Sequence, residues 1–191
     1  TSQIIKATLR NIESCVHDVK VNDLATFDVD YMFTQIRSKS VGESTIVGGN
    51  CSKCDHVSQV SVDLSKINIS ECPEEIVELS SDLKVKMKYP TYKDMLVSEK
   101  IMDPKAPMID KMLESIINCM NIVYYNEEQT ELKNETREEI EKFVNSLTSE
   151  QLQKLVAFVE SLPQLSAEVN FKCEECGTDG SVRLDGLADF F

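Results

Sequence analysis

Two Cys-x-x-Cys pairs, separated by more than half of the chain, constrain its fold more than any other feature. Cys51 and Cys54 form the first pair, and Cys173 and Cys176 form the second. The residues on both sides of each pair have strand character, and those after it alternate between apolar and polar. The sequence therefore predicts two copies of one hairpin, each with a cysteine pair in its turn.

Two matching pairs supply the four thiolates that a tetrahedral Zn²⁺ ion requires. The two-residue spacer allows one tight turn to point both sulfurs the same way, while backbone N–H groups of the turn donate to the thiolates. Gly177 suits the left-handed conformation that such a turn needs, and Asp55 occupies the equivalent place in the first copy. Four thiolates leave no open coordination position for a substrate. We therefore predict a structural zinc site formed by Cys51, Cys54, Cys173 and Cys176.

Other uses of these cysteines remain as alternatives. Two disulfides could join the same hairpins, but the chain has 7 cysteines, an odd number, and no secretory leader pattern. A thiol oxidoreductase would place its single pair between a strand and a helix. Iron is the alternative metal for four thiolates. His56 is a competing ligand, which we interpret as a surface residue.

The composition predicts a folded globular protein and disfavours two classes of partner. Hydrophobic residues make up 41% and charged residues 28% of the chain, and the formal net charge is −13. Such a charge repels nucleic-acid phosphates and anionic membrane surfaces. Lys53, Lys172 and Arg183 are the cations near the cysteines, too few for a basic patch. With no apolar stretch long enough to cross a bilayer, we expect a soluble intracellular protein.

The spacing of the cysteine pairs predicts an α+β fold in which a long segment interrupts a split, zinc-ribbon-like module. We expect a helical N-terminal segment at 1–44, the first hairpin at 45–70, an inserted mainly helical domain with one strand at 71–165, and the second hairpin with a C-terminal tail at 166–191. Because the chain begins with Thr1 rather than Met, we also expect that a native N-terminal segment precedes it.

Apolar periodicity predicts the elements at the two ends of the chain. Amphipathic helices are expected at 4–16, with Cys15 in the buried stripe, and at 28–38. We interpret Gly48 and Gly49 as a turn or bulge. The tail ends in Phe190 and Phe191, whose rings we expect to pack beneath the hairpins or to contact another protein.

Within the insert, alternation over 83–89 predicts the one strand. We interpret its outward-facing lysines as protection of a sheet edge; these are Lys84, Lys86 and Lys88. Helical spacing predicts helices at 92–102 and 108–125 and then a helical hairpin. The second helix of that hairpin begins with a capping box of Thr148 and Gln151, and Pro163 ends it.

Both ends of the chain also resemble a known family. The resemblance rests on residues 31–43 and 51–64 around the first cysteine pair, and on 147–163, 173–177 and 186–191 around the second. These motifs are similar to those of the baseplate hub subunits, or hub assembly proteins, of T4-type tailed bacteriophages. The middle of the chain, roughly 71–134, matches only in its helical pattern.

The resemblance implies a non-enzymatic component or assembly factor of the tail baseplate hub. Its partners would be other hub proteins and the tape-measure protein, in the cytoplasm of the infected cell and in the virion; a homo-oligomer is also compatible. The alternative is a zinc ribbon that binds nucleic acid, for instance in transcription, which would need a basic or aromatic face. An enzyme would need an open metal position or an exposed thiolate of low pKa.

Overall fold

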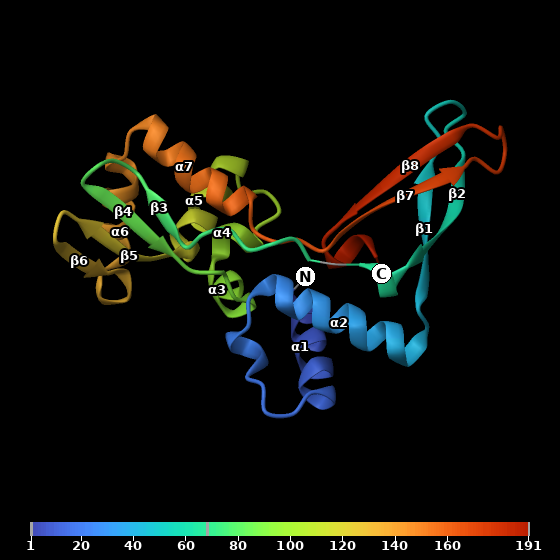
Figure 1. Cartoon of the computed structure of the whole chain (residues 1–191), viewed down its shortest axis with the longest axis horizontal. Coiled ribbons are helices and arrows are strands. Elements are labelled where there is room, and N and C mark those ends of the chain that lie inside the picture. Colours follow the sequence, from blue (N-terminus) through green and yellow to red (C-terminus); the bar gives the residue numbers. More distant parts are fainter. Residues whose placement is uncertain (1, 68, 191) are drawn as a thin grey trace. The chain divides into compact units, whose positions relative to one another are not determined.

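Two compact units make up the part of the chain that the structure describes (Figure 1). The computed structural model describes residues 2–67 and 69–190, with the backbone alone for Ser2, Ile4, Glu99 and Met102. The insert unit consists of Cys72–Leu162 with the short segments 2–5 and 22–26. The hairpin unit consists of Lys6–Val21, Phe27–Glu71 and residues 163–190. The predicted insert at 71–165 falls largely within the first of these units.

Two antiparallel hairpins of identical construction form the hairpin unit. Their strands each have seven residues: β1 (Ser44–Asn50), β2 (Val57–Asp63), β7 (Ser166–Lys172) and β8 (Asp179–Asp185). The registers correspond, since Ser44 pairs with Asp63 and Ser166 pairs with Asp185. β1 contacts β8 and β2 contacts β7, so the hairpins lie against each other (Figure 1).

The base of the hairpins is closed by a small apolar core. Its buried members include Phe190, which follows the short 3-10 turn η4 (Leu187–Asp189), and Leu64, which opens another, η2 (Leu64–Lys66). The other buried members are Val62, Ile67, Leu165 and Leu184. Phe190 thus packs beneath the hairpins, whereas Phe191 lies outside the described residues. Gly48 and Gly49 are regular members of β1, so the prediction of a turn or bulge there was wrong.

Helices precede the first hairpin. These are α1 (Ser2–Cys15) and α2 (Thr26–Val41), with the 3-10 turn η1 (Val21–Asp23) between them. The predicted buried position of Cys15 was wrong: it is exposed at the last residue of α1. The buried stripe ends one turn earlier, at Ile12. A residue that continues a helical period is buried only as far as the packing surface extends.

A four-stranded antiparallel sheet, in the order β3-β4-β5-β6, organises the insert unit. The strands are β3 (Ile76–Glu78), β4 (Leu83–Met87), β5 (Met120–Tyr125) and β6 (Glu128–Glu131). The helical elements are α3 (Tyr92–Val97), α4 (Glu99–Met102), α5 (Met108–Cys119), the 3-10 turn η3 (Leu132–Asn134), α6 (Arg137–Ser146) and α7 (Ser149–Glu160). The core combines the sheet residues Val85, Met87 and Val123 with apolar residues of α5, α6 and α7.

The sheet corrects three predictions about the insert. A single strand was expected, and the helix predicted at 108–125 ends at Cys119, where β5 begins. Residues 121–125 are mainly β-branched or aromatic and favour a strand. β4 is also an interior strand, so its lysines do not protect an edge. Lys84 pairs with Glu78 and Lys86 with Glu75 instead. Lys88, which directly follows β4, pairs with Asp94.

The predicted helical hairpin is confirmed. The Thr148 hydroxyl accepts a hydrogen bond from the Gln151 N–H, and the Gln151 side chain accepts one from the Thr148 N–H, which is the capping box expected at the start of α7. Two further capping boxes were not predicted: Thr136 with Glu139 at the start of α6, and Thr91 with Asp94 at the start of α3. No helix among residues 2–67 and 69–190 is both long and apolar enough to cross a membrane.

Candidate metal centre

Each hairpin carries its cysteine pair in the turn at its tip. Cys51 directly follows β1, and Cys173 directly follows β7. In both turns the N–H of the first cysteine donates a hydrogen bond to a carbonyl on the opposite side of the turn. The acceptor is His56, at 2.9 Å, in the first hairpin and Thr178, at 2.8 Å, in the second. Equal strand lengths and equal registers therefore place the two pairs at equivalent points.

The turns share one backbone conformation. In each turn the residue after the second cysteine closes the turn by donating its N–H to the carbonyl of the first cysteine. Asp55 donates to Cys51 at 3.0 Å, and Gly177 donates to Cys173 at 2.9 Å. Both closing residues are left-handed, with φ of 56° at Asp55 and 68° at Gly177. The left-handed conformation expected at Gly177 is confirmed, and Asp55 adopts it with the moderate strain that a Cβ atom brings.

The two tips bring the four predicted cysteines together. Their sulfur atoms all lie within 4.8 Å of one another. Three separations are 3.6 Å for Cys51 to Cys176, 3.6 Å for Cys54 to Cys173 and 3.4 Å for Cys54 to Cys176. A tetrahedron with Zn–S bonds of about 2.3 Å has edges of about 3.8 Å, so the sulfurs need only small movements to surround an ion. The four thiols could bind a metal ion, and its identity stays a prediction.

Burial and hydrogen bonding differ within each pair. The first cysteine of each pair, Cys51 or Cys173, is 3% exposed, whereas the second is exposed. Cys51 Sγ also accepts a hydrogen bond from the backbone N–H of Lys53 at 3.5 Å. The buried sulfurs face the hairpin interior and the outer sulfurs complete the cluster, as expected for a site held between two tips.

Hydrogen bonds and crowding act in opposite directions on the thiols. The Thr178 hydroxyl and N–H lower the pKa of Cys176 to about 6, and backbone N–H groups, first that of Cys176, lower the pKa of Cys173. His56 also lowers the pKa of Cys54 through its backbone, but the neighbouring thiols and desolvation outweigh this and raise it to about 12. Hydrogen bonds thus lower the pKa of Cys173 and Cys176, whereas the neighbouring thiols raise that of Cys54, since like charges repel. A divalent cation would remove that repulsion.

One aromatic ring packs closely between the two hairpins, in space that two glycines leave. A Cβ atom on Gly49 would lie 2.8 Å from Cε1 of Phe171 and 2.8 Å from Cγ2 of Val60. A Cβ atom on Gly180 would lie 3.0 Å from the same ring. Ordinary carbon contacts are about 3.5–4.0 Å. The Phe171 ring therefore fills the space that two glycines leave, one on its own hairpin and one on the other.

A hydrogen bond also crosses between the hairpins beside the cysteines. The N–H of Glu174 donates to the Ser58 hydroxyl at 3.1 Å, and Ser58 is buried. Glu174 also lies 3.9 Å from Nε2 of His56, which is partly exposed. His56 thus does not belong to the cluster. The sequence reasoning missed Gly49, Ser58 and Phe171; aligning the two halves on their cysteines could have found them, because Phe171 and Gly49 occupy equivalent positions.

The other three cysteines lie apart from this cluster. Cys15 and Cys72 are exposed, and Cys119 is buried in the core of the insert unit, where burial raises its pKa to about 12. No further group of three or more metal-ligating side chains occurs in the described part of the chain.

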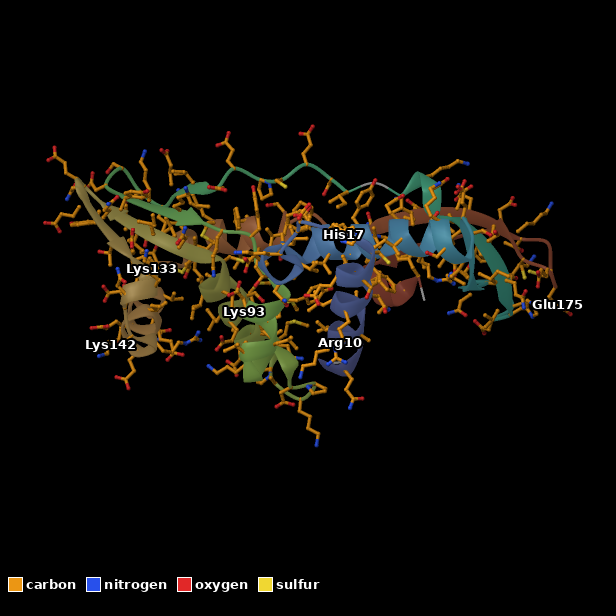
Figure 2. All side chains as sticks on the ribbon, turned by 90° about the horizontal axis from the view of Figure 1, so that it is seen from below. Arg10, His17, Lys93, Lys133, Lys142 and Glu175 are labelled. Atoms are coloured by element: carbon orange, nitrogen blue, oxygen red, sulfur yellow. The ribbon has the colours of Figure 1, made fainter. Side chains whose placement is uncertain are left out.

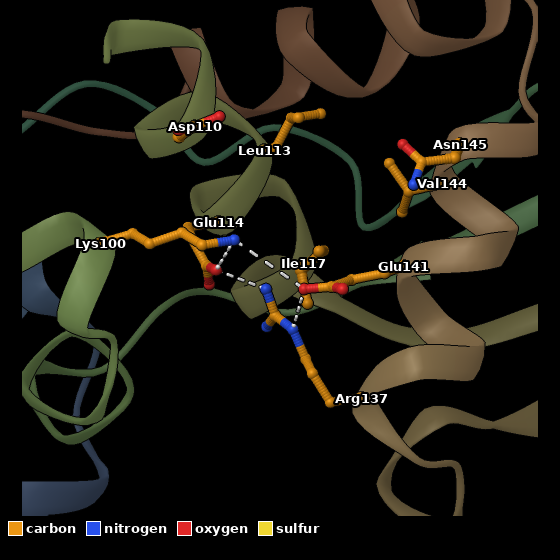
Figure 3. A pocket seen from close by; sticks show the side chains of 9 residues that line it. All are labelled: Lys100, Asp110, Leu113, Glu114, Ile117, Arg137, Glu141, Val144 and Asn145. Carbon is orange, nitrogen blue, oxygen red and sulfur yellow. Dashed lines mark hydrogen bonds and ion pairs between the residues drawn. The ribbon is translucent and has the colours of Figure 1, made fainter. Parts of the chain in front are cut away.

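A second candidate is a pocket of about 150 Å³ in the insert unit (Figure 3). Glu114 is 6% exposed and faces Arg137 at 2.5 Å and Lys100 at 3.3 Å, and it accepts a hydrogen bond from Ser98 at 3.3 Å. Arg137 also binds Glu141 at 2.9 Å. The carboxylates neutralise the cations, so we interpret this cluster as an ion-pair network that joins α4, α5 and α6. It was not predicted, because its members come from separate helices.

Charged side chains are spread over many elements (Figure 2). The labelled cations Arg10, Lys93, Lys133 and Lys142 come from α1, α3, η3 and α6. Arg183 on β8 is paired with Asp185 at 2.9 Å, and Glu175 lies in the second cysteine turn. Within the hairpin unit, the paired Arg183 and the acidic Glu175 do not provide the basic face that nucleic-acid binding requires.

Comparison with known proteins assigns the chain to a class of phage tail proteins. A family model described as T4 bacteriophage base plate protein matches residues 1–191, and the chain belongs to this family. The resemblance to baseplate hub proteins is thereby confirmed. The family is one of structural and assembly proteins, not a class of enzymes.

A particular relative is the baseplate hub assembly protein gp26 of Enterobacteria phage T4. It is 23% identical to the chain over 183 residues, which cover 94% of this chain and 77% of the relative. No solved structure matches the chain.

Proposed function

We propose that the chain is a structural or assembly component of a phage tail baseplate hub. The family match over the whole chain is the observation that carries this proposal, and the name of the T4 relative supports the hub in particular. The partners are other hub proteins, with the tape-measure protein as a further candidate. The chain acts in the cytoplasm of the infected cell during assembly and is a candidate component of the tail in the virion.

We further propose that the four clustered cysteines hold one structural Zn²⁺ ion in a zinc-ribbon-like arrangement. Zinc suits the site because it accepts four thiolates in tetrahedral geometry and carries no redox chemistry of its own. The ion would join two hairpins that are distant in sequence and that share a small core at their base and a few contacts near their tips. Binding free energy at such a site is folding free energy, because the unfolded chain does not hold the four sulfurs together.

In this function the metal keeps the hairpin unit in one shape for its partners. The insert connects the two hairpins in sequence, so both of its ends lead into the same joined pair. The net charge of −13 favours protein partners with basic surfaces over nucleic acid. The zinc therefore organises a binding scaffold and performs no reaction.

Native mass spectrometry of the purified chain, alone and mixed with purified hub proteins of the same phage, tests both parts. We expect one zinc ion per chain and a defined hetero-complex. Cys173→Ser should lose the zinc, expose apolar surface to a hydrophobic dye and fail to assemble, because three thiolates hold zinc far less tightly. Cys72→Ser, which removes an exposed cysteine outside the cluster, is the matched control and should keep both properties.

The zinc proposal and the hub proposal can fail separately. A metal-free Cys173→Ser chain that still assembles would refute the zinc scaffold and leave the hub function standing. Zinc binding without any hub complex, together with salt-dependent DNA or RNA binding, would favour the nucleic-acid alternative.

A further inference from the structure

The outer edge of β1 has unpaired backbone groups. Leu64 donates its N–H to Glu43 at 2.8 Å and Cys51 donates to His56 at 2.9 Å. Since paired and unpaired positions alternate along an antiparallel strand, the odd-numbered residues of β1 bond to β2, and Ile46 and Gly48 direct their N–H and C=O groups the other way. β2 is the one sheet neighbour of β1 among the described residues, and within them these groups of Ile46 and Gly48 form no hydrogen bond.

An open hollow of about 390 Å³ follows this edge. Four consecutive residues of β1, 45–48, line it, together with Arg37 and the η4 segment at 188–190. Successive side chains of a strand point to opposite faces, so a hollow that contacts four in a row runs along the strand's edge. The Thr45 hydroxyl donates to the Phe190 carbonyl at 3.1 Å, which fixes the far wall of the hollow.

The second hairpin provides an internal comparison for this surface. Inward-facing positions are alike in the two hairpins: Val47 corresponds to Val169 and Val60 to Val182. Outward-facing positions differ in charge, and the pairs are Ile46 with Glu168, Val57 with Asp179, and Ser61 with Arg183. Ile46 is 66% and Val57 58% exposed. At these three positions the outer face of the first hairpin lacks the charges that the second one has, whereas Asp63 and Asp185 correspond.

This difference matters because exposed strand edges pair readily with other chains. Natural proteins protect such edges with charged residues, proline or bulges. β7 carries Glu168 and Lys172, whereas β1, with the sequence Ser-Thr-Ile-Val-Gly-Gly-Asn, carries no charge, no proline and no bulge. β1 thus has no charged residue, although charged residues make up 28% of the chain.

We propose that the edge of β1 binds an extended segment of a different polypeptide, which adds to the hairpin as a third strand. Alternating unpaired donors and acceptors specify an extended backbone as the ligand. The segment places an apolar side chain beside Ile46, over the hollow, and is poor in acidic residues, because the net charge of −13 disfavours an acidic partner. A second copy of this chain is disfavoured because each copy carries a charge of −13. The inference goes beyond the proposed function, which assigns no binding surface.

The experiment selects 12-residue peptides from a random library on the zinc-loaded chain and measures the affinity of the selected peptides. Bound peptides should be rich in β-branched residues, poor in Asp and Glu, and should slow hydrogen exchange of the Ile46 and Gly48 amides. Ile46→Glu, which copies the residue of the second hairpin, and Ile46→Pro, which removes an outward N–H, should each weaken binding at least about tenfold. Val57→Asp changes the same face on β2 and should leave the affinity within about threefold.

Several results would overturn the proposal. Selected peptides could bind equally to wild type and Ile46→Glu, or they could leave the Ile46 and Gly48 amides unprotected. Alternatively, the chain could protect these amides by associating with itself, in a way that Ile46→Glu abolishes. The last result would assign the edge to a second copy of the chain. If Ile46→Glu still forms hub complexes normally, the proposed hub function stands, but the edge of β1 is not the surface that binds the hub proteins.

Discussion

Replacing Gly49 by alanine should separate the two cysteine pairs without touching a cysteine. The added Cβ would lie 2.8 Å from the Phe171 ring and from Val60, about 0.7–1.2 Å closer than ordinary carbon contacts. The ring cannot retreat freely, because Gly180 is packed against it from its own hairpin. Overpacking of this kind costs about 1–3 kcal/mol. Moving the hairpins apart relieves the contact with Phe171 but not the one with Val60, which lies on the same hairpin as Gly49. Only part of the cost therefore passes into metal binding, and zinc affinity should fall by at least about 5-fold and by less than about 150-fold.

Competition with a chromogenic zinc chelator measures this change directly. Gly48→Ala is the matched control, because its Cβ would meet only the exposed end of Val57, at 3.0 Å, and that side chain can rotate away. We expect less than about a threefold change for the control. Adding Phe171→Leu to Gly49→Ala should restore part of the affinity by relieving the clash. Equal zinc affinities for the Gly48 and Gly49 variants, or no recovery in the double variant, would refute the role of the ring.

Two further predictions concern stability. Glu114→Gln removes a buried carboxylate from Arg137 and Lys100, whose side chains are 42% and 53% exposed, and should lower the free energy of unfolding by about 1–3 kcal/mol. Glu141→Gln, at a side chain 42% exposed, should cost less than about 1 kcal/mol. Urea unfolding followed by circular dichroism compares the two variants, and equal losses would contradict the ion-pair interpretation. Stability should also fall in acid, since hydrogen bonds from Ser65 lower the pKa of Asp63 from 3.8 to about 2, and Arg137 lowers that of Glu141. As the pH falls, the two carboxylates bind protons in the unfolded chain before they do in the folded one. Their contribution to stability is therefore present above about pH 4 and is lost toward pH 2. A melting temperature that stays constant between pH 5 and pH 2.5 would argue against this prediction.

Local sequence patterns predicted the hairpins and several helices correctly. The turn residues, the capping box at Thr148 and the alternation after each cysteine pair act over a few residues, so the sequence displays them directly. The error at 108–125 has the opposite origin. Its apolar spacing suits both a helix and a strand beyond Cys119, and pairing of β5 with β4 and β6 decides in favour of the strand. The lysines of β4 were misinterpreted for the same reason, because a strand's place in a sheet depends on its neighbours.

The sequence by itself determined the four candidate metal ligands, the conformation of their turns and the family of the protein. These follow from residue types at short spacing, where geometry is local and a Cys-x-x-Cys turn has few alternatives. Only the tertiary structure decided that the two pairs meet, that Phe171 fills the space left by Gly49 and Gly180, that Glu114 is buried among cations, and that β1 keeps an unprotected edge. Each of these depends on contacts between segments far apart in the chain, and no local pattern encodes which distant side chain will occupy a given space.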